Sequence, residues 1–200
     1  MTSVVAICNR ALANIAKQRI DALDEGTAEA RACRLFYEPV RDAVLQSYPW
    51  RCAGKTVALA EVASPPSSPW LHAYQRPFDC LRVRWIRPNY STSDRCVLTL
   101  QQEVSIPYDV DGDLIFCNLP VAFLRYTSRL ADVTSLSPLL AEAIEWHLAA
   151  RLAMPLTKDP KIRADALQLA RDIQSKAEVA DANETHETSD HDSEMIEARG

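Results

Sequence analysis

Glycine is scarce in this sequence, and several familiar site motifs are missing with it. Only 4 of the 200 residues are glycine, and the chain contains no G-x-G-x-x-G loop, P-loop or G-x-S-x-G elbow. No apolar run approaches the roughly 18 residues that a membrane-spanning helix needs. No basic segment precedes the first apolar stretch, so we expect no signal peptide. These absences disfavour a nucleotide-dependent enzyme, an α/β-hydrolase and a membrane protein.

Cysteine and histidine are present but do not form a recognisable site. No two of the six cysteines are closer than 16 residues, which excludes a C-x-x-C redox or zinc motif. We expect the cysteines to be small buried hydrophobic residues. His72 and His147 are the only histidines before the C-terminal segment. A distant Cys/His catalytic pair is conceivable, but no local signature supports it, and we expect His147 to be packed or to face a partner.

The acidic stretch 109–113 resembles the start of a calcium loop. An EF-hand needs glycine at the sixth position and glutamate at the twelfth, where this chain has Leu114 and Pro120. The Asp111-Gly112 pair is instead typical of a hairpin turn. The sequence therefore predicts a turn here and no metal site.

The charge of the chain is concentrated at one end. Hydrophobic residues make up 48% and charged residues 24%, an ordinary balance for a globular protein, and the net charge is −5. Residues 183–200 contain six acids and one arginine, so this segment carries the whole excess. The remaining chain is neutral, which argues against a protein that coats DNA non-specifically. Acidic segments of this kind usually stay solvated or dock on a partner.

A group of arginines follows in the middle of the chain. We interpret them as candidate contacts to a partner or to DNA, the alternative being a solvated strand face with local ion pairs. They are Arg76, Arg82, Arg84, Arg87 and Arg95.

Apolar periodicity predicts helices at both ends of the chain. The first two are expected over 3–17 and 27–48, with a kink or break at Pro39 inside the second. Two more are expected after Ser137-Pro138 and after Asp159-Pro160, the last with a stripe formed by Ile162, Ala166, Leu169, Ile173 and Ala177.

Short β-like runs separated by turn residues occupy 51 to about 134. Strands are expected at 56–62, 81–86, 97–100, 104–107, 114–118 and 122–127. The fold class is therefore α+β: a four-helix bundle built from both chain ends (1–50 and 137–182), an inserted small antiparallel β domain (51–136) and an extended acidic C-terminal tail (183–200).

An ordered set of short motifs then points to a family. It begins with Ile7-Cys8-Asn9-Arg10-Ala11-Leu12 and an alanine-rich helix that ends at Tyr48-Pro49-Trp50. It continues with Pro77-Phe78-Asp79-Cys80-Leu81-Arg82-Val83 and Leu124-Arg125-Tyr126-Thr127. Over roughly 4–182 the chain resembles the tail adaptor proteins of short-tailed bacteriophages, also called tail tubular protein A.

The resemblance implies a structural virion protein. Members of the family form dodecameric rings between the portal vertex and the tail nozzle, and viral DNA passes through the ring during ejection. The expected partners are therefore like subunits, the portal protein, the nozzle protein and DNA, with no membrane, catalysis, metal or cofactor. The protein would be assembled in the host cytoplasm and reside in the virion tail.

The family also implies a C-terminal extension that docks on the portal. Here this would be 183–200, with portal-binding residues Glu194, Met195, Ile196 and Glu197. The alternatives are a head-completion or stopper connector of another tailed phage and, from different classes, a small cysteine/histidine hydrolase or a nucleic-acid-binding regulator.

Overall fold

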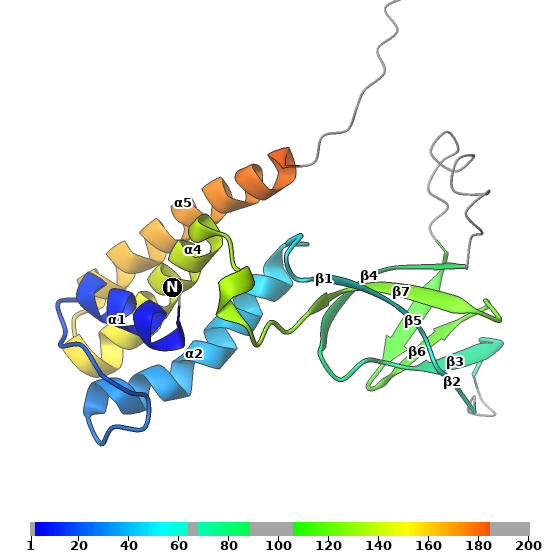
Figure 1. The fold of residues 1–200 in the computed structure, drawn as a ribbon, viewed down its shortest axis with the longest axis horizontal. Coiled ribbons are helices and arrows are strands. Elements are labelled where there is room, and N and C mark those ends of the chain that lie inside the picture. Colours follow the sequence, from blue (N-terminus) through cyan, green and yellow to red (C-terminus); the bar gives the residue numbers. More distant parts are fainter. Residues whose placement is uncertain (1–2, 64–67, 89–105, 185–200) are drawn as a thin grey trace, which may run out of the picture.

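A computed structural model describes residues 3–63, 68–88 and 106–184 of the chain. These residues form a mixed α+β fold with four α-helices and two small antiparallel sheets. The helices lie together in one half of the molecule and the strands in the other (Figure 1). Each half has its own cluster of buried hydrophobic residues.

Helix α1 (Val4–Asn14) begins where Ser3 caps it, since the Ser3 hydroxyl accepts a hydrogen bond from the amide of Ala6 at 3.1 Å. It is shorter than the predicted 3–17. Ala16 has a φ of 56°, which is left-handed backbone and cannot continue a right-handed helix. Ile15 is buried all the same, as its place in the apolar stripe predicts.

Helix α2 (Ala28–Ser47) runs without interruption through Pro39, so of the two predicted outcomes, a kink or a break, the break does not occur. Proline removes one donor and leaves the carbonyl four residues earlier, that of Leu35, without its helical partner. Leu35 and Pro39 both lie on an exposed part of the helix, where water can bond that carbonyl. The helix ends before Pro49, and Trp50 then turns inward, with its indole Nε1 donating to the carbonyl of Val44 at 2.8 Å.

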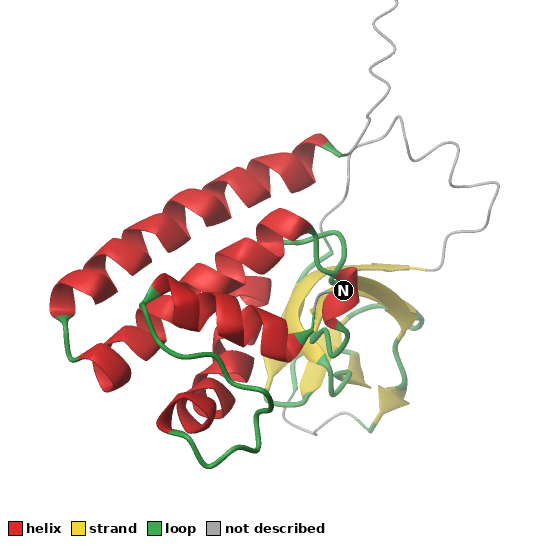
Figure 2. Ribbon diagram, turned by 60° about the vertical axis from the view of Figure 1, so that its left-hand side comes forward, coloured by secondary structure: helices red, strands yellow, loops and turns green. Residues whose placement is uncertain are grey.

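The other two helices begin at the predicted caps. Helix α4 (Pro138–Thr157) has Ser137 as its N-cap, and α5 (Pro160–Asn183) has Asp159. Helix α4 contacts α1, α2 and α5, so the two ends of the chain share one core (Figure 2). In α5 the buried residues are Ala166, Ala170 and Ala177. Leu169 is exposed, so its predicted place in the stripe is wrong.

In the part of the chain that the structure describes, seven strands lie between the two helical pairs. They are β1 (Gly54–Ala58), β2 (Glu61–Val62), β3 (His72–Gln75), β4 (Cys80–Pro88), β5 (Tyr108–Asp111), β6 (Leu114–Cys117) and β7 (Ala122–Ser128).

These strands form two sheets in the predicted β region. One sheet has the order β1-β7-β4 and the other β2-β3-β6-β5, with every pair antiparallel. Strand β3 was not predicted. The expected hairpin turn is confirmed between β5 and β6, where Gly112 has a φ of 56°. The strands predicted at 97–100 and 104–107 fall wholly or partly outside the described residues.

Strand β4 is irregular, because its register against β7 shifts twice, between Cys80 and Arg82 and between Val83 and Trp85. Each bulge adds a residue and changes which side chains share a face. The side chains of β4 therefore do not alternate simply between the two faces, and Ile86 is buried in the core of the sheets.

Candidate interaction surfaces

Two arginines of strand β4 contact the backbone at and just after the C-terminal end of helix α2. Arg82 Nη1 donates to the carbonyls of Gln46 and Ser47 at 3.3 and 3.5 Å. Arg84 Nη2 donates to the carbonyl of Trp50 at 2.6 Å, and its Nε to the hydroxyl of Thr127 at 2.9 Å. Carbonyls at a helix C-terminus lack helical partners and carry partial negative charge, so cations are favoured there.

The other predicted arginines have different surroundings. Arg76 Nη2 donates to the carbonyl of Cys80 at 2.7 Å and thereby braces its own turn. The guanidinium of Arg87 lies 4.2 Å from the ring centroid of Trp85, a cation–π contact. Arg95 is outside the described residues. The structure thus brings Arg82 and Arg84 together at the junction of the two halves, where they bind backbone carbonyls rather than the local carboxylates we had considered.

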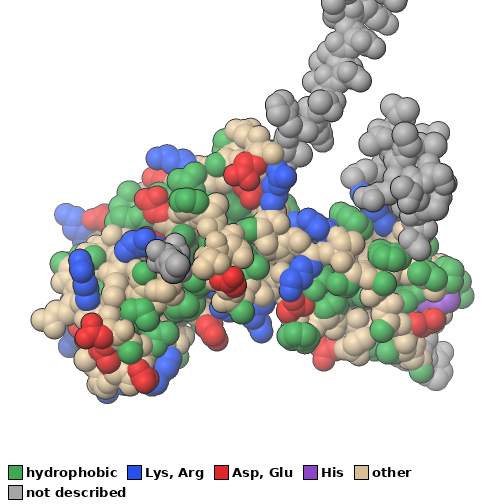
Figure 3. All heavy atoms as spheres, viewed as in Figure 1, with side chains coloured by type: hydrophobic (Ala, Val, Ile, Leu, Met, Phe, Trp, Pro, Cys, Tyr) green, Lys and Arg blue, Asp and Glu red, His purple; other side chains and the backbone are tan. Residues whose placement is uncertain are grey.

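A second set of polar contacts holds the same junction. Asp79 accepts from Lys55 Nζ at 2.6 Å and from the Tyr126 hydroxyl at 2.8 Å. Burial raises the pKa of Asp79, but these two hydrogen bonds outweigh it and hold the pKa below its ordinary value. Asp42 on α2 pairs with Arg129 at 2.7 Å. On the face drawn in Figure 3, Lys and Arg side chains lie between the helices and the strands.

Phe78 stands out at this junction because its side chain is 98% exposed. The turn that carries it is firmly held. The amide of Cys80 donates to the carbonyl of Pro77 at 3.0 Å, and the amide of Arg129 donates to the carbonyl of Asp79 at 2.7 Å. The backbone that carries Phe78 is thus fixed while its aromatic ring is exposed, and aromatic side chains of this kind are frequent interface anchors.

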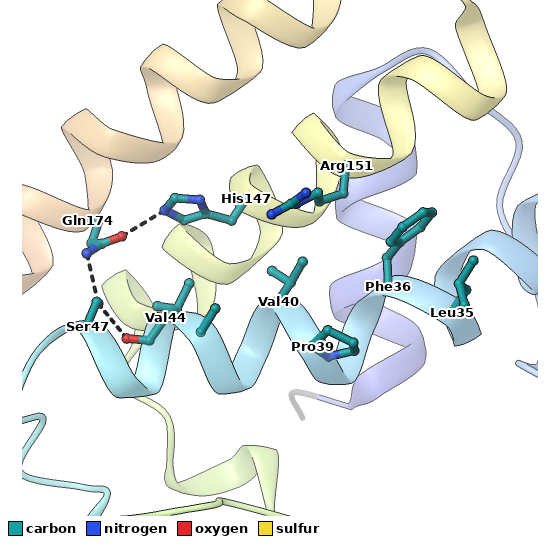
Figure 4. A pocket seen from close by; sticks show the side chains of 10 residues that line it. Leu35, Phe36, Pro39, Val40, Val44, Ser47, His147, Arg151 and Gln174 are labelled. Carbon is teal, nitrogen blue, oxygen red and sulfur yellow. Dashed lines mark hydrogen bonds between the residues drawn. The ribbon is translucent and has the colours of Figure 1, made fainter. Parts of the chain in front are cut away.

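The helical half contains an apolar groove between α2, α4 and α5 (Figure 4), with a volume of about 560 Å³. Its floor comes from one face of α2, where the side chains follow at helical spacing. The lining residues of α2 are Leu35, Phe36, Pro39, Val40, Ala43, Val44 and Ser47. Leu35, at one end, is 65% exposed.

Polar side chains form the opposite wall of the groove. His147 Nε2 donates to Gln174 Oε1 at 2.8 Å, and Gln174 Nε2 donates to the hydroxyl of Ser47 at 3.1 Å (Figure 4). Burial lowers the pKa of His147, and the nearby positive charges of Arg151 and Arg171 lower it further. His147 is thus packed, as predicted, and the groove joins an apolar floor to a polar wall that contains one cationic side chain, Arg151.

A smaller and more polar pocket of about 510 Å³ lies between α1 and α4. Arg10 reaches across it to Glu145 with an Nε–Oε1 distance of 2.7 Å. Burial raises the pKa of Glu145, while Arg10 opposes the shift. Sequence reasoning did not find this pair, because the two residues are distant in the chain and nothing in the local sequence links them.

Four of the six cysteines are buried among the described residues, as predicted: Cys8, Cys33, Cys80 and Cys117. Cys52 is partly exposed, and Cys96 lies outside the described residues. Cys8 and Cys33 meet where α1 faces α2, and the contact with Cys33, together with burial, raises the pKa of Cys8. His72 pairs with Glu61 at 2.7 Å and His147 with Gln174, so neither histidine pairs with a thiol.

Over residues 3–63, 68–88 and 106–184 no cluster of three or more His, Cys, Asp or Glu side chains could hold a metal ion. Within those ranges no helix is long and apolar enough to cross a membrane. The residues expected to bind the portal, Glu194, Met195, Ile196 and Glu197, lie outside the described residues.

Comparisons with known proteins give no assignment. No protein-family model matches the sequence, and no curated protein matches it.

Proposed function

We propose that this protein is a structural subunit of a head-to-tail adaptor ring in a short-tailed bacteriophage. The proposal begins from the ordered resemblance over roughly 4–182. The observation that carries it further is the pair of apolar surfaces, the groove on the helices and the fully exposed Phe78 at the sheet turn. A ring subunit needs such surfaces, because each copy meets two like neighbours through different faces.

The architecture supports the same proposal. Helices from both chain ends flank seven strands in the described residues, and a large β insertion favours a short-tail adaptor over a stopper connector. In the proposed subunit α1, α2, α4 and α5 form the four-helix bundle, and 183–200 forms the acidic extension that meets the portal. Glu194, Met195, Ile196 and Glu197 would then contact the portal, and the opposite end of the ring would contact the nozzle.

The net charge of the chain is compatible with the proposed DNA channel. Residues 1–182 carry no net charge, so the ring would let DNA slide without the phosphate pairing that binds it tightly. Three of the described arginines, Arg76, Arg82 and Arg84, already donate to backbone carbonyls of the chain. We therefore assign these three a mainly structural role in the subunit.

Electron microscopy of the full chain mixed with the portal ring encoded beside it tests the proposal. We expect an added ring of density at the narrow end of the portal, and the image symmetry gives the number of copies. A Phe78→Ser variant should weaken the added ring, whereas Leu71→Ser, which changes another exposed apolar residue (73% exposed), serves as the matched control. A folded protein that adds no density to the portal would refute the adaptor assignment.

A further inference from the structure

The apolar groove is a binding surface without an occupant among the described residues. It lies open along α2 and is lined there mostly by apolar side chains. Exposed apolar surfaces that are contiguous and concave usually mark a binding site, because leaving them in water is unfavourable. A molecule or segment that covers the groove in the free protein would remove this cost.

We propose that the C-terminal segment 185–200 of the same chain occupies this groove in the free subunit, with Met195 and Ile196 as its apolar anchor. These two are the only large apolar side chains in the segment. Methionine is flexible and fills irregular apolar gaps well. The proposal concerns the subunit alone, so it holds or fails whether or not the protein is a phage adaptor.

The point of attachment favours this occupant. Asp181, near the end of α5, accepts a hydrogen bond from the backbone amide of Arg51 at 3.3 Å. Arg51 follows Ser47 by four residues, and Ser47 lies at one end of the groove. The C-terminal segment therefore starts beside the groove and need not cross the molecule to enter it.

The length of the segment is sufficient as well. From Ser47 to Leu35 the floor of the groove spans 12 residues of α2, which is about 18 Å at 1.5 Å per residue. Met195 comes 11 residues after Glu184, and 11 extended residues cover about 36–40 Å. About half of that length remains for the path from the end of α5 to the groove.

The charges are complementary. Segment 185–200 contains five acids and one arginine, a net charge of −4 with its histidines neutral. The groove presents Arg151, and Arg171 is close enough to lower the pKa of His147 together with it, after burial. Glu178, which accepts from Gln174 at 2.8 Å, is an acid on the same side. Docked carboxylates would face the arginines while Met195 and Ile196 contact the apolar floor.

A segment held in this way cannot bind elsewhere at the same time. If the portal takes up the segment, as the proposed function has it, the groove of that subunit becomes free for a neighbouring copy. Docking would thus keep the free subunit monomeric and allow ring contacts only on the portal. This consequence rests on the proposed function, whereas occupancy of the groove does not.

Photo-crosslinking of the full chain without any portal tests the occupancy. Ile196→p-benzoylphenylalanine places the reactive group at the anchor, and mass spectrometry of the monomer band locates the crosslink. We expect crosslinks to α2 and α4 within the groove. Leu35→Glu and Arg151→Glu should each lower their yield at least several-fold, because both add negative charge facing an acidic segment. Leu71→Glu, an equally exposed leucine on the strand half, should leave the yield unchanged.

Three results would overturn the proposal. They are crosslinks scattered over the molecule, groove crosslinks found only in a dimer band, and a yield that Leu35→Glu leaves unchanged. The dimer result would assign the groove to a second copy. Circular dichroism of each variant checks that it is folded. Adding the portal ring afterwards separates the two proposals, since the crosslink is measured before the portal is present and portal binding is read independently.

Discussion

Replacing Arg84 by methionine tests whether the arginines of β4 hold the two halves of the molecule together. Methionine keeps much of the apolar stem of the side chain and removes the guanidinium. Both hydrogen bonds of that group are lost, the one to the carbonyl of Trp50 at 2.6 Å and the one to the hydroxyl of Thr127 at 2.9 Å. Thr127 is fully buried, so its hydroxyl cannot form a hydrogen bond with water instead.

The expected cost follows from these contacts. A hydrogen bond to a charged group contributes about 1.5–3 kcal/mol, and a buried polar group left without a partner costs a similar amount. The Trp50 carbonyl keeps a second donor, the amide of Ala53 at 3.2 Å, so Thr127 accounts for most of the loss. We expect the free energy of unfolding to fall by about 2–3 kcal/mol. For a chain of this size that corresponds to a melting temperature lower by roughly 4–12 °C.

Thermal and urea denaturation, followed by circular dichroism and tryptophan fluorescence, measure the loss. Arg82→Met is the matched control, because Arg82 is exposed and its hydrogen bonds, at 3.3 and 3.5 Å, are at the long limit. We expect it to cost less than about 1 kcal/mol. Equal losses for the two variants, or no loss for Arg84→Met, would refute the structural role that we assign to Arg84.

Three further changes give separate tests. Gly112→Ala should destabilise the protein by about 1–2 kcal/mol in urea denaturation, because its φ of 56° is unfavourable for alanine, whereas Gly26→Ala, with no such constraint, should be nearly neutral. Asp79 has a lowered pKa in the folded state, so it stabilises the protein above about pH 4, and this stabilisation is lost as the pH falls. Asp79→Asn should therefore flatten the dependence of the urea midpoint on pH below about pH 4. His147 also has a lowered pKa, so stability should fall as the pH drops below about 6.5, and His147→Gln should remove that slope. A slope that persists in either pH variant would contradict the assignment.

The helices could be predicted from the sequence because their signals are local. Ser137-Pro138 and Asp159-Pro160 each place a side-chain acceptor and a proline within three residues, and α4 and α5 begin there. Whether Pro39 breaks the helix could not be predicted, because the cost of a proline depends on whether the freed carbonyl is buried. The helix is exposed at that point, which the sequence pattern around Pro39 does not reveal.

The sheets could be predicted only as a β-rich region. Strand β7 pairs with both β1 and β4, and β3 pairs with both β2 and β6, so the division into two sheets depends on partners far apart in the chain. Nothing local in a strand specifies such a partner. Strand β3 (His72–Gln75) is also only four residues long, too short for its side chains to show a clear alternation in the sequence.

The role of the arginines could not be predicted from the sequence either. Sequence reasoning compared two roles for Arg82 and Arg84, contact with a partner and pairing with nearby carboxylates. The structure reveals a third, because the carbonyl end of α2 lies across from β4. Backbone acceptors have no sequence signature, so this role could be found only once the two elements were placed side by side.

Helix α2 connects the groove to the sheet half through its last turn. The Ser47 hydroxyl accepts from Gln174 in the groove, and the Ser47 carbonyl accepts from Arg82 on β4. One turn earlier, Asp42 pairs with Arg129 beside the turn that carries Phe78. A subunit built this way presents the groove and Phe78 in a fixed relation, because both are attached to the same helix. If copies assemble into the closed ring that we propose, that relation would set the angle between neighbouring copies, and contacts within one copy would influence how many copies complete the ring.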